Sequence, residues 1–487
     1  MARRQTLLFS VLGLLAAGCT VGPDYKRPEV SAPPVYRGAD AGPPAAGAAS
    51  FGDLAWDSVF PDPDLQALIR TALAQNYDVR VAAARILQAQ SLVTVARSRQ
   101  FPTVDGGINA PYTTYSGSDR PATYPGHIFE PVAGLGVAWE LDFWGRFRRS
   151  TEAAQAELLA SQDARYAVIA TLVAEVGRAY LTLRALDLTL EISRRTVDSR
   201  VQSVDLVQAR VDGGVAGILD VRQAESLLYT ATKTIPEIQR QIEETENFIS
   251  ILLGQDPGPV KRGRPLEQQV AAPALPPGLP TELLTRRPDI RAAEQQLVAA
   301  NAQIGVAKAL LYPQITLSGL AGVGGATIDG SSFGPFGVFS ALGAFTLPIF
   351  NAGRLQANVE FNEARAQEAA LLYQQTLQQS LREVSDALVG IRKRQEFRQQ
   401  QELLVKALAD GSEVAKLRYE GGVSSYLEVL DTERQLFDAE RDLVLAKRDE
   451  SLSVIQLYRA LGGGWQAEPP AAAGGGQTAG AEAAPAR

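Results

Sequence analysis

The chain contains the stretch Arg210-Val211-Asp212-Gly213-Gly214-Val215 and, 208 residues later, the similar stretch Arg418-Tyr419-Glu420-Gly421-Gly422-Val423. The similarity continues without a gap, so that Leu253-Gly254 recurs as Leu461-Gly462. Self-similarity over most of a chain predicts one architecture built from two similar halves. A doubled architecture suits a structural wall, whereas a catalytic centre has no need to be doubled.

The composition argues against several classes of function. The 487 residues carry a formal net charge of -7, which disfavours nucleic acid as a partner. One histidine (His127) and one cysteine (Cys19) argue against zinc sites, Cys-His nucleophiles, disulfides and iron-sulfur clusters. We therefore predict no enzyme, no metal site and no cofactor apart from a covalent lipid.

The N-terminus has the pattern of a targeting segment. A basic pair, Arg3-Arg4, precedes an apolar run from Leu7 to Leu15 that is too short to span a bilayer, and small residues follow before Cys19. Two interpretations are open: an ordinary secretory signal, or a lipoprotein signal. We favour the second, in which Cys19 becomes the N-terminus and carries diacylglycerol and N-acyl groups.

Composition also predicts where the domains begin and end. We expect a lipoprotein signal peptide at 1–18, a lipid-anchored N-terminal linker at 19–60, a first repeat at 61–254, a Pro-rich inter-repeat linker at 255–280, a second repeat at 281–463 and a disordered tail at 464–487.

Each half contains a long run without proline. Proline is absent from Val132 to Ile235 and from Ile349 to Glu468, and an internal proline costs a helix about 3 kcal/mol. The helical pattern extends from Ser150 to Val211 and from Leu355 to Tyr419. About 60 residues at 1.5 Å each predict helices of roughly 90 Å, which suit fibrous coiled coils and conduits.

A pair of strand-like segments precedes each long helix. The segments are rich in Gly, Tyr, Thr and Val and lack a helical stripe; they are Val104 to Ser116, Ile128 to Asp142, Ile315 to Gly325 and Phe336 to Thr346. Strands of about ten residues cross a membrane when tilted. The alternative is a pair of soluble hairpins packed on the helices.

If these four strands span a membrane, several chains must share them. The smallest membrane barrels use about eight strands, and an open sheet in lipid would leave two rows of backbone groups unpaired. Two or three chains would supply about eight or twelve strands. We therefore predict an α+β membrane protein with four transmembrane β-strands and long α-helical hairpins per chain, in two tandem repeats.

Aromatic and basic residues follow the strands. Trp139, Phe143, Trp144 and Arg146 lie at the end of the second segment, and Phe350 and Arg354 occupy the matching place in the second half. Such residues are typical of the girdle at a membrane interface. A core aromatic cluster with solvated arginines is the alternative.

The chain resembles the OprM/NodT-like lipoproteins of the TolC-like fold, the outer-membrane ducts of tripartite efflux pumps. The matching segments are Cys19 to Pro28, Phe143 to Arg149, Leu284 to Glu294 and Gly421 to Leu427. The resemblance implies a lipid-anchored homotrimer in the bacterial outer membrane, with a 12-stranded β-barrel on a periplasmic α-helical barrel. It further implies a periplasmic adaptor (membrane fusion protein) and an inner-membrane transporter of the resistance-nodulation-division (RND) type as partners, with drugs or other small solutes as cargo.

The repeated Gly-Gly motif falls between a long helix and its partner helix, where two glycines permit a tight reversal. By the resemblance, these tips form the periplasmic entrance. We predict that Arg-carboxylate links between adjacent tips hold the entrance shut; the residues are Arg210, Asp212, Asp220, Arg222, Arg418, Glu420, Ser424, Glu428 and Asp431. Related ducts often have an acidic residue at the position of Ser424. The alternative is that these are solvated helix-terminal charges.

The same tips are the predicted adaptor contact. The turn and docking residues are Gly213, Gly214, Val215, Leu219, Gly421, Gly422, Val423 and Leu427. Two rival functions remain open: a secretion duct for proteins, and a periplasmic coiled-coil adaptor or structural lipoprotein.

Overall fold

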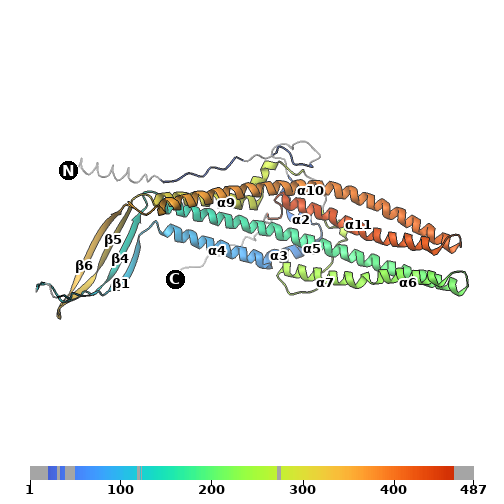
Figure 1. Cartoon of the computed structure of the whole chain (residues 1–487), viewed down its shortest axis with the longest axis horizontal. Coiled ribbons are helices and arrows are strands. Elements are labelled where there is room, and N and C mark those ends of the chain that lie inside the picture. Colours follow the sequence, from blue (N-terminus) through green and yellow to red (C-terminus); the bar gives the residue numbers. More distant parts are fainter. Residues whose placement is uncertain are drawn as a thin grey trace, which may run out of the picture. The chain divides into compact units, whose positions relative to one another are not determined.

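The computed structural model describes residues 20–29, 33–38, 50–117, 121, 123–270 and 276–465. The predictions for residues 1–18, for Cys19 and for the tail beyond Trp465 lie outside these residues. The elements (Figure 1) are η1 Phe51–Asp53, α2 Trp56–Val59, α3 Pro63–Gln75, α4 Tyr77–Ser98, β1 Thr103–Asn109, β2 Tyr112–Thr114, β3 His127–Phe129, β4 Val132–Leu141, α5 Arg146–Asp212, α6 Ile218–Thr232, α7 Thr234–Leu253, η2 Leu266–Gln268, η3 Pro280–Glu282, α8 Leu283–Arg286, α9 Pro288–Ala309, β5 Gln314–Ile328, β6 Ser331–Thr346, α10 Arg354–Glu420 and α11 Tyr426–Ala460.

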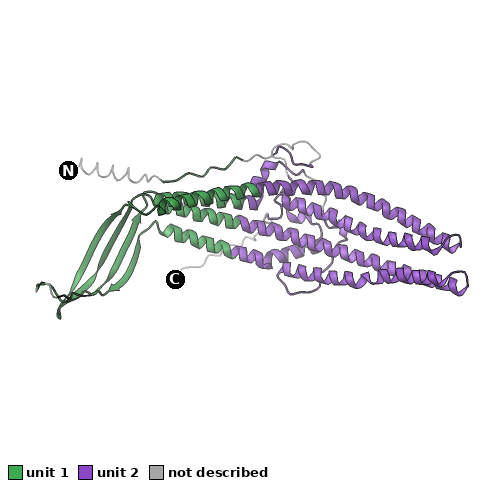
Figure 2. Cartoon of the chain, in the orientation of Figure 1, with its two compact units in different colours: residues 1–30, 84–162, 291–375 green, residues 31–83, 163–290, 376–487 purple. Residues whose placement is uncertain are grey.

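The chain divides into two compact units (Figure 2). Unit 1 comprises residues 1–30, 84–162 and 291–375, and unit 2 comprises residues 31–83, 163–290 and 376–487. Unit 1 contains the six strands β1 to β6, and unit 2 contains both Gly-Gly turns. Each unit takes segments from both sequence halves, so the duplication builds each unit from two similar contributions.

The strands of unit 1 form one antiparallel sheet in the order β1-β4-β5-β6 (Figure 1). The small β2–β3 hairpin joins the far end of β5 through the pair Ile128 and Ile328. The two predicted segments of the first half are each divided, at Pro111 and at Pro131, because proline has no N–H to donate to the ladder. The Pro131 carbonyl still accepts a hydrogen bond from Gly325 N (3.0 Å).

The two long helices are confirmed. Helices α5 and α10 each contain 67 residues, which gives each a length of about 100 Å. Both begin directly after a glycine in the left-handed region, Gly145 (φ +78°) and Gly353 (φ +81°). The Asp142 carboxylate accepts hydrogen bonds from two backbone N–H groups of the first turn of α5, at 3.2 and 2.9 Å. The long helical hairpins and the strand segments in two repeats, expected from the sequence, are thereby confirmed for the chain.

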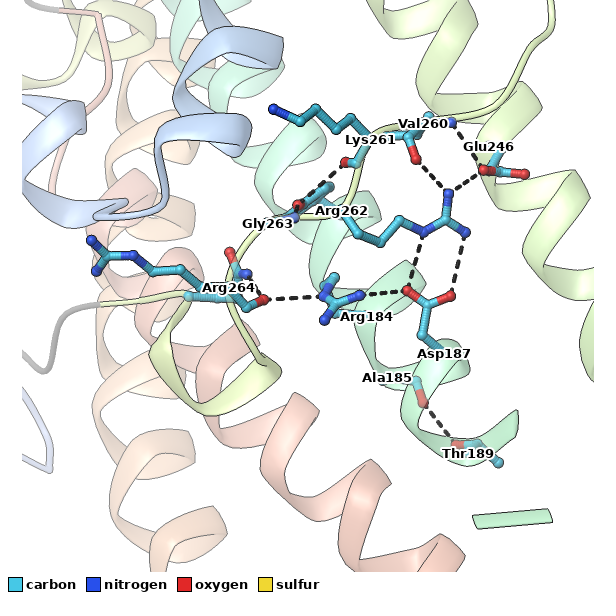
Figure 3. Close-up of polar contacts among 12 residues, drawn as sticks. Arg184, Ala185, Asp187, Thr189, Glu246, Val260, Lys261, Arg262, Gly263 and Arg264 are labelled. Carbon is cyan, nitrogen blue, oxygen red and sulfur yellow. Dashed lines mark hydrogen bonds and ion pairs between the residues drawn. The ribbon is translucent and has the colours of Figure 1, made fainter. Parts of the chain in front are cut away.

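The Pro-rich segment between the halves is held in place by charged side chains. In Figure 3 the Arg262 guanidinium lies between Asp187 of α5 and Glu246 of α7. The Arg262 N–H groups donate to Asp187 at 3.2 and 3.3 Å and also to Glu246. The Arg184 guanidinium also donates to Asp187 (2.7 Å), and it donates to the Arg264 carbonyl oxygen as well (3.1 Å). The composition of this segment predicted a linker, and the contacts of Arg262 and Arg264 show that its described part packs on α5 and α7 within unit 2.

We expect Arg262→Gln to lower the stability of unit 2 by about 1–3 kcal/mol, because Glu246 and Asp187 each lose a charge-assisted hydrogen bond in a half-buried site. The measurement is the temperature at which the purified protein loses its helical circular dichroism. Arg240→Gln is the matched control, since Arg240 also bridges two carboxylates (Glu237 and Glu244), but on the exposed surface of α7. An equal change in melting temperature for both variants would show that the contacts of Arg262 do not stabilise unit 2 more than an exposed ion pair does.

Candidate functional site at the helical tips

The two Gly-Gly turns have the same backbone geometry. In the first turn Gly213 N, Gly214 N and Val215 N donate to the carbonyls of residues 209, 211 and 210 at 2.9–3.0 Å. The second turn repeats these bonds at 3.0 Å, with donors 208 residues later. Gly214 and Gly422 have φ of +73° and +75°, a region that favours glycine. The predicted helix reversals therefore lie where the sequence places them.

A shared apolar core joins the two tips within one chain. This tip core consists of Val207, Val221, Ala224, Ala415, Tyr419, Tyr426 and Val429. The rings of Tyr419 and Tyr426 meet edge to face with centroids 5.2 Å apart. Because α5, α6, α10 and α11 all contribute to the tip core, the two hairpins pack as one body.

Arg210 is the predicted gate residue that crosses from one hairpin to the other. Its guanidinium lies 4.6 Å from the ring centroid of Tyr419 and donates to the Glu420 carbonyl oxygen at 3.1 Å. Within one chain Arg210 therefore contacts a backbone carbonyl and an aromatic face, and the predicted Arg-carboxylate links between adjacent tips remain a prediction. Burial raises the pKa of the Tyr419 phenol; the charge of Arg210 opposes this shift, and the charge of Asp220 adds to it.

Five of the other predicted gate charges form contacts inside their own hairpin. Arg418 lies 3.5 Å from Glu428 across the second turn, with both side chains about half exposed. Short pairs along one helix are Arg222–Glu225 (2.6 Å), Asp431–Arg434 (3.0 Å) and Gln208–Asp212 (2.8 Å). Links between the tips of neighbouring chains remain a prediction. The side-chain oxygen of Ser424 is buried beside the turn.

A second cluster of charged side chains, Arg200, Lys416 and Glu433, lies next to the tip core, and the sequence did not reveal it. Arg200 is only 2% exposed; it donates to the Leu227 carbonyl (2.5 Å) and lies 4.9 Å from the Phe437 ring centroid. Burial lowers the pKa of Arg200, and the charge of Glu433 opposes this shift. Glu433, 7% exposed, pairs with Lys416 at 2.7 Å. The only sequence feature that drew attention to this cluster was the alignment of Glu433 with Glu225 in the repeat.

The predicted docking residues are exposed at both turns. Val215, Leu219, Val423 and Leu427 are between 58% and 69% exposed. Ile218, which the sequence analysis did not select, is 59% exposed beside them. Between the hairpins, a cavity of about 140 Å³ is lined by Tyr419, Tyr426, polar side chains and three aliphatic side chains. A cavity of this size is smaller than a drug-sized ligand site, whereas the exposed apolar rim suits a macromolecular contact.

The predicted membrane-interface residues of unit 1 fall into two groups. The first group has partners within the fold. Trp144 stacks on Tyr312 (4.8 Å between ring centroids) and donates to the Pro313 carbonyl oxygen. Trp139 donates to the Gln100 carbonyl oxygen, and Arg146 forms an ion pair with Glu140. Phe143 is partly buried, whereas Phe350 is 89% exposed and Arg354 is exposed. Their position at a membrane surface remains a prediction.

Residues 68–255 and 279–463 match the family described as outer membrane efflux protein. The chain belongs to this family. The matched segments correspond to the two halves of the sequence; the domain boundaries predicted above remain predictions. Among the described residues, no group of three or more His, Cys, Asp and Glu side chains is arranged to hold a metal ion.

Similar proteins point to the same function. The chain is 34% identical over 461 residues to the toluene efflux pump outer membrane protein TtgF of Pseudomonas putida, which covers 93% of this chain and 96% of the relative. It is 31% identical over 463 residues to the cation efflux system protein CusC of Escherichia coli, covering 94% and 99% of the two chains.

Solved structures with the same fold are outer-membrane channels. The outer-membrane channel OprN matches with a TM-score of 0.84 and 32% identity, covering 92% of this chain and 100% of the other. The open state of the MtrE outer membrane channel of Neisseria gonorrhoeae matches with a TM-score of 0.82 and 30% identity, covering 92% and 99%. The chain is therefore an outer-membrane efflux channel protein that extends into the periplasm, which confirms the predicted family, function and location.

Proposed function

We propose that three copies of the chain form a passive, lipid-anchored efflux duct that is closed at the helical tips and opened by a periplasmic adaptor. The sheet of unit 1 is the observation that carries the proposal. Its outer strands β1 and β6 each pair with one described neighbour, β4 and β5 respectively, so that each has one free edge. Free edges in lipid are costly, and three copies of the four-stranded body supply twelve strands.

The charged and apolar tips support the gating part of the proposal. Arg210 links the two hairpins, and apolar side chains surround both turns. In the proposed assembly the RND-type transporter of the inner membrane supplies the energy, because we assign no catalytic residue and no cofactor to the duct. The acyl groups on Cys19 hold it in the outer membrane.

The test of the assembly is the state of the detergent-purified full chain. We expect a trimer by native mass spectrometry that conducts ions in planar bilayers. A stable monomer, or a trimer without conductance, would contradict the proposal.

For the gate we expect Arg210→Ala with Arg418→Ala to raise the open probability of single channels several-fold, up to about tenfold. The reason is that a cation-π contact and an exposed ion pair together contribute about 1 kcal/mol, and 1.4 kcal/mol is tenfold. Arg210→Ala alone should give most of this effect, since Arg418 pairs within its own hairpin. Arg222→Ala is the control, because Arg222 pairs only along α6. Unchanged conductance in the double variant would rule out the gate.

A further inference from the structure

The N-terminal residues 20–29 lie on unit 1 as an extended strap. Val21 N donates to the Trp144 carbonyl (3.0 Å), and the Asn301 side chain donates to the Pro23 carbonyl (2.9 Å). These contacts place the strap against the beginning of α5 and along α9. The composition of residues 19–60 had predicted only a linker, without a binding role.

Glu294 on α9 is the principal socket for the strap. Its carboxylate accepts two hydrogen bonds from the Arg27 guanidinium, at 2.6 and 2.8 Å, and one from the Tyr25 hydroxyl at 3.0 Å. Glu294 is 6% exposed, whereas the Arg27 side chain is about half exposed. Hydrogen bonding to Glu294 raises the pKa of Arg27; burial, and then the charge of Glu294, raise that of Tyr25.

A second socket has the opposite charge. Arg149 on α5 is 5% exposed and donates to Asp24 of the strap at 2.6 Å, as well as to Glu152 at 2.8 Å. In both sockets the helix supplies the buried charge and the strap supplies the exposed partner. Loss of the Arg27 or Asp24 side chain with the strap still in place would leave a buried carboxylate or guanidinium without its strap partner, and unpaired buried charges are strongly destabilising.

Two glycines allow the strap to touch the helix backbone. A Cβ atom on Gly22 (φ +105°) would lie 2.5 Å from Gly305 Cα, and a Cβ atom on Gly305 would lie 2.8 Å from the Val21 carbonyl oxygen. Gly305 is inside α9, where glycine costs about 1 kcal/mol relative to alanine. The close approach of the strap gives a physical reason for glycine at this position.

We infer that residues 20–29 are a docking segment whose sockets, Glu294 and Arg149, fix the lipid-bearing end of the chain at the strand–helix junction of unit 1. Cys19 precedes Val21 by two residues, so its acyl groups would leave the chain within about 7 Å of Val21, whose N–H is bonded to the Trp144 carbonyl. This inference rests on the proposed acylation of Cys19. The strap also joins two of the segments that define the family resemblance, Cys19 to Pro28 and Leu284 to Glu294.

The test is limited trypsin digestion of the full chain in native detergent, followed by mass spectrometry of the N-terminal peptide. Trypsin cuts after Lys26, which lies in the strap and is present in every variant. We expect Glu294→Gln to speed this cleavage at least about tenfold, because charge-assisted hydrogen bonds contribute about 1.5–3 kcal/mol. The control is Glu363→Gln, which removes the exposed Lys308–Glu363 pair of the same unit and should leave the rate unchanged.

Two further variants distinguish release of the strap from a general loss of folding. Gly305→Ala keeps both sockets but pushes on the strap, so it should also speed cleavage, although alanine favours the helix. In an Arg27→Gln background, Glu294→Gln should raise the melting temperature, since it removes a buried charge that has lost its partner. Equal cleavage in wild type, Glu294→Gln and Gly305→Ala would overturn the inference. The mass of the released peptide tests acylation separately: an unmodified Cys19 would refute the lipid anchor of the proposed function while leaving the cleavage result to decide on the strap.

Discussion

Gly134→Ala should remove most of the folded channel from the outer membrane. Gly134 of β4 faces Gly322 of β5 in the register, and the two backbones are very close. A Cβ atom on Gly134 would lie 2.5 Å from the Ala321 carbonyl oxygen and 2.8 Å from Gly322 Cα. Backbone atoms cannot swing aside like a flexible side chain, so β4 and β5 must separate. We expect a cost of about 3 kcal/mol, at the upper end for overpacking.

The measurement is the amount of heat-resistant assembled protein in the outer-membrane fraction. Gly136→Ala is the matched control, two residues further along the same face of β4, where a Cβ atom would lie 3.8 Å from the nearest atom, the Asp105 carbonyl oxygen. Alanine should be neutral or stabilising there, because glycine weakens strands. Gly322→Ala should reproduce the loss seen for Gly134→Ala. If Gly134→Ala and Gly136→Ala accumulate equally, the close approach of β4 and β5 does not limit folding.

The second large effect is expected at the tips, where Gly422→Asp should reduce efflux-dependent resistance at least about tenfold while the channel still assembles. A Cβ atom on Gly422 would meet nothing within 4 Å, so the new side chain points into open space beside the exposed Val423 and Leu427. In the proposed complex a carboxylate there must lose its water against an adaptor, and burial of an unpaired charge costs several kcal/mol.

Gly422→Asn separates charge from backbone strain. Asn has nearly the shape of Asp and tolerates the left-handed φ of +75° at this position, so it should retain most of the resistance. The readouts are the minimal inhibitory concentration of an exported drug and adaptor binding by the purified channel. Equal loss for Asp and Asn would mean that the backbone of the turn matters and the apolar surface does not. The same pair at Gly214 tests whether both hairpins dock.

The sequence predicted the elements that depend on local chemistry. Proline-free runs gave helices of 67 residues, and the repeated glycine pairs gave two turns with matching hydrogen bonds. The strand segments were located as well, although the effect of Pro111 and Pro131 on the ladder was missed. A full structure was needed to see that these prolines divide two predicted segments into four strands.

The contact partners of the charged residues near the tips could not be predicted from the sequence. Arg210 was selected because it is a basic residue beside the turn, yet its partners are a carbonyl and a ring on the other hairpin. Glu225 and Glu433 occupy equivalent places in the repeat, but Glu225 forms a pair along its own helix while Glu433 is buried against Lys416. Aligned residues in the two halves can thus have opposite environments.

The sequence by itself determined the doubled plan, the long helices, the glycine turns and the family, because these follow from backbone preferences and from motifs that are local in the chain. Only the tertiary structure decided which charges are buried. Glu294, Arg149, Arg200 and Glu433 are ordinary polar residues on helices, and each is in contact with a residue of another helix or segment. The physical reason is that the cost of a buried charge depends on the three-dimensional surroundings and partners of the group, which no local pattern specifies.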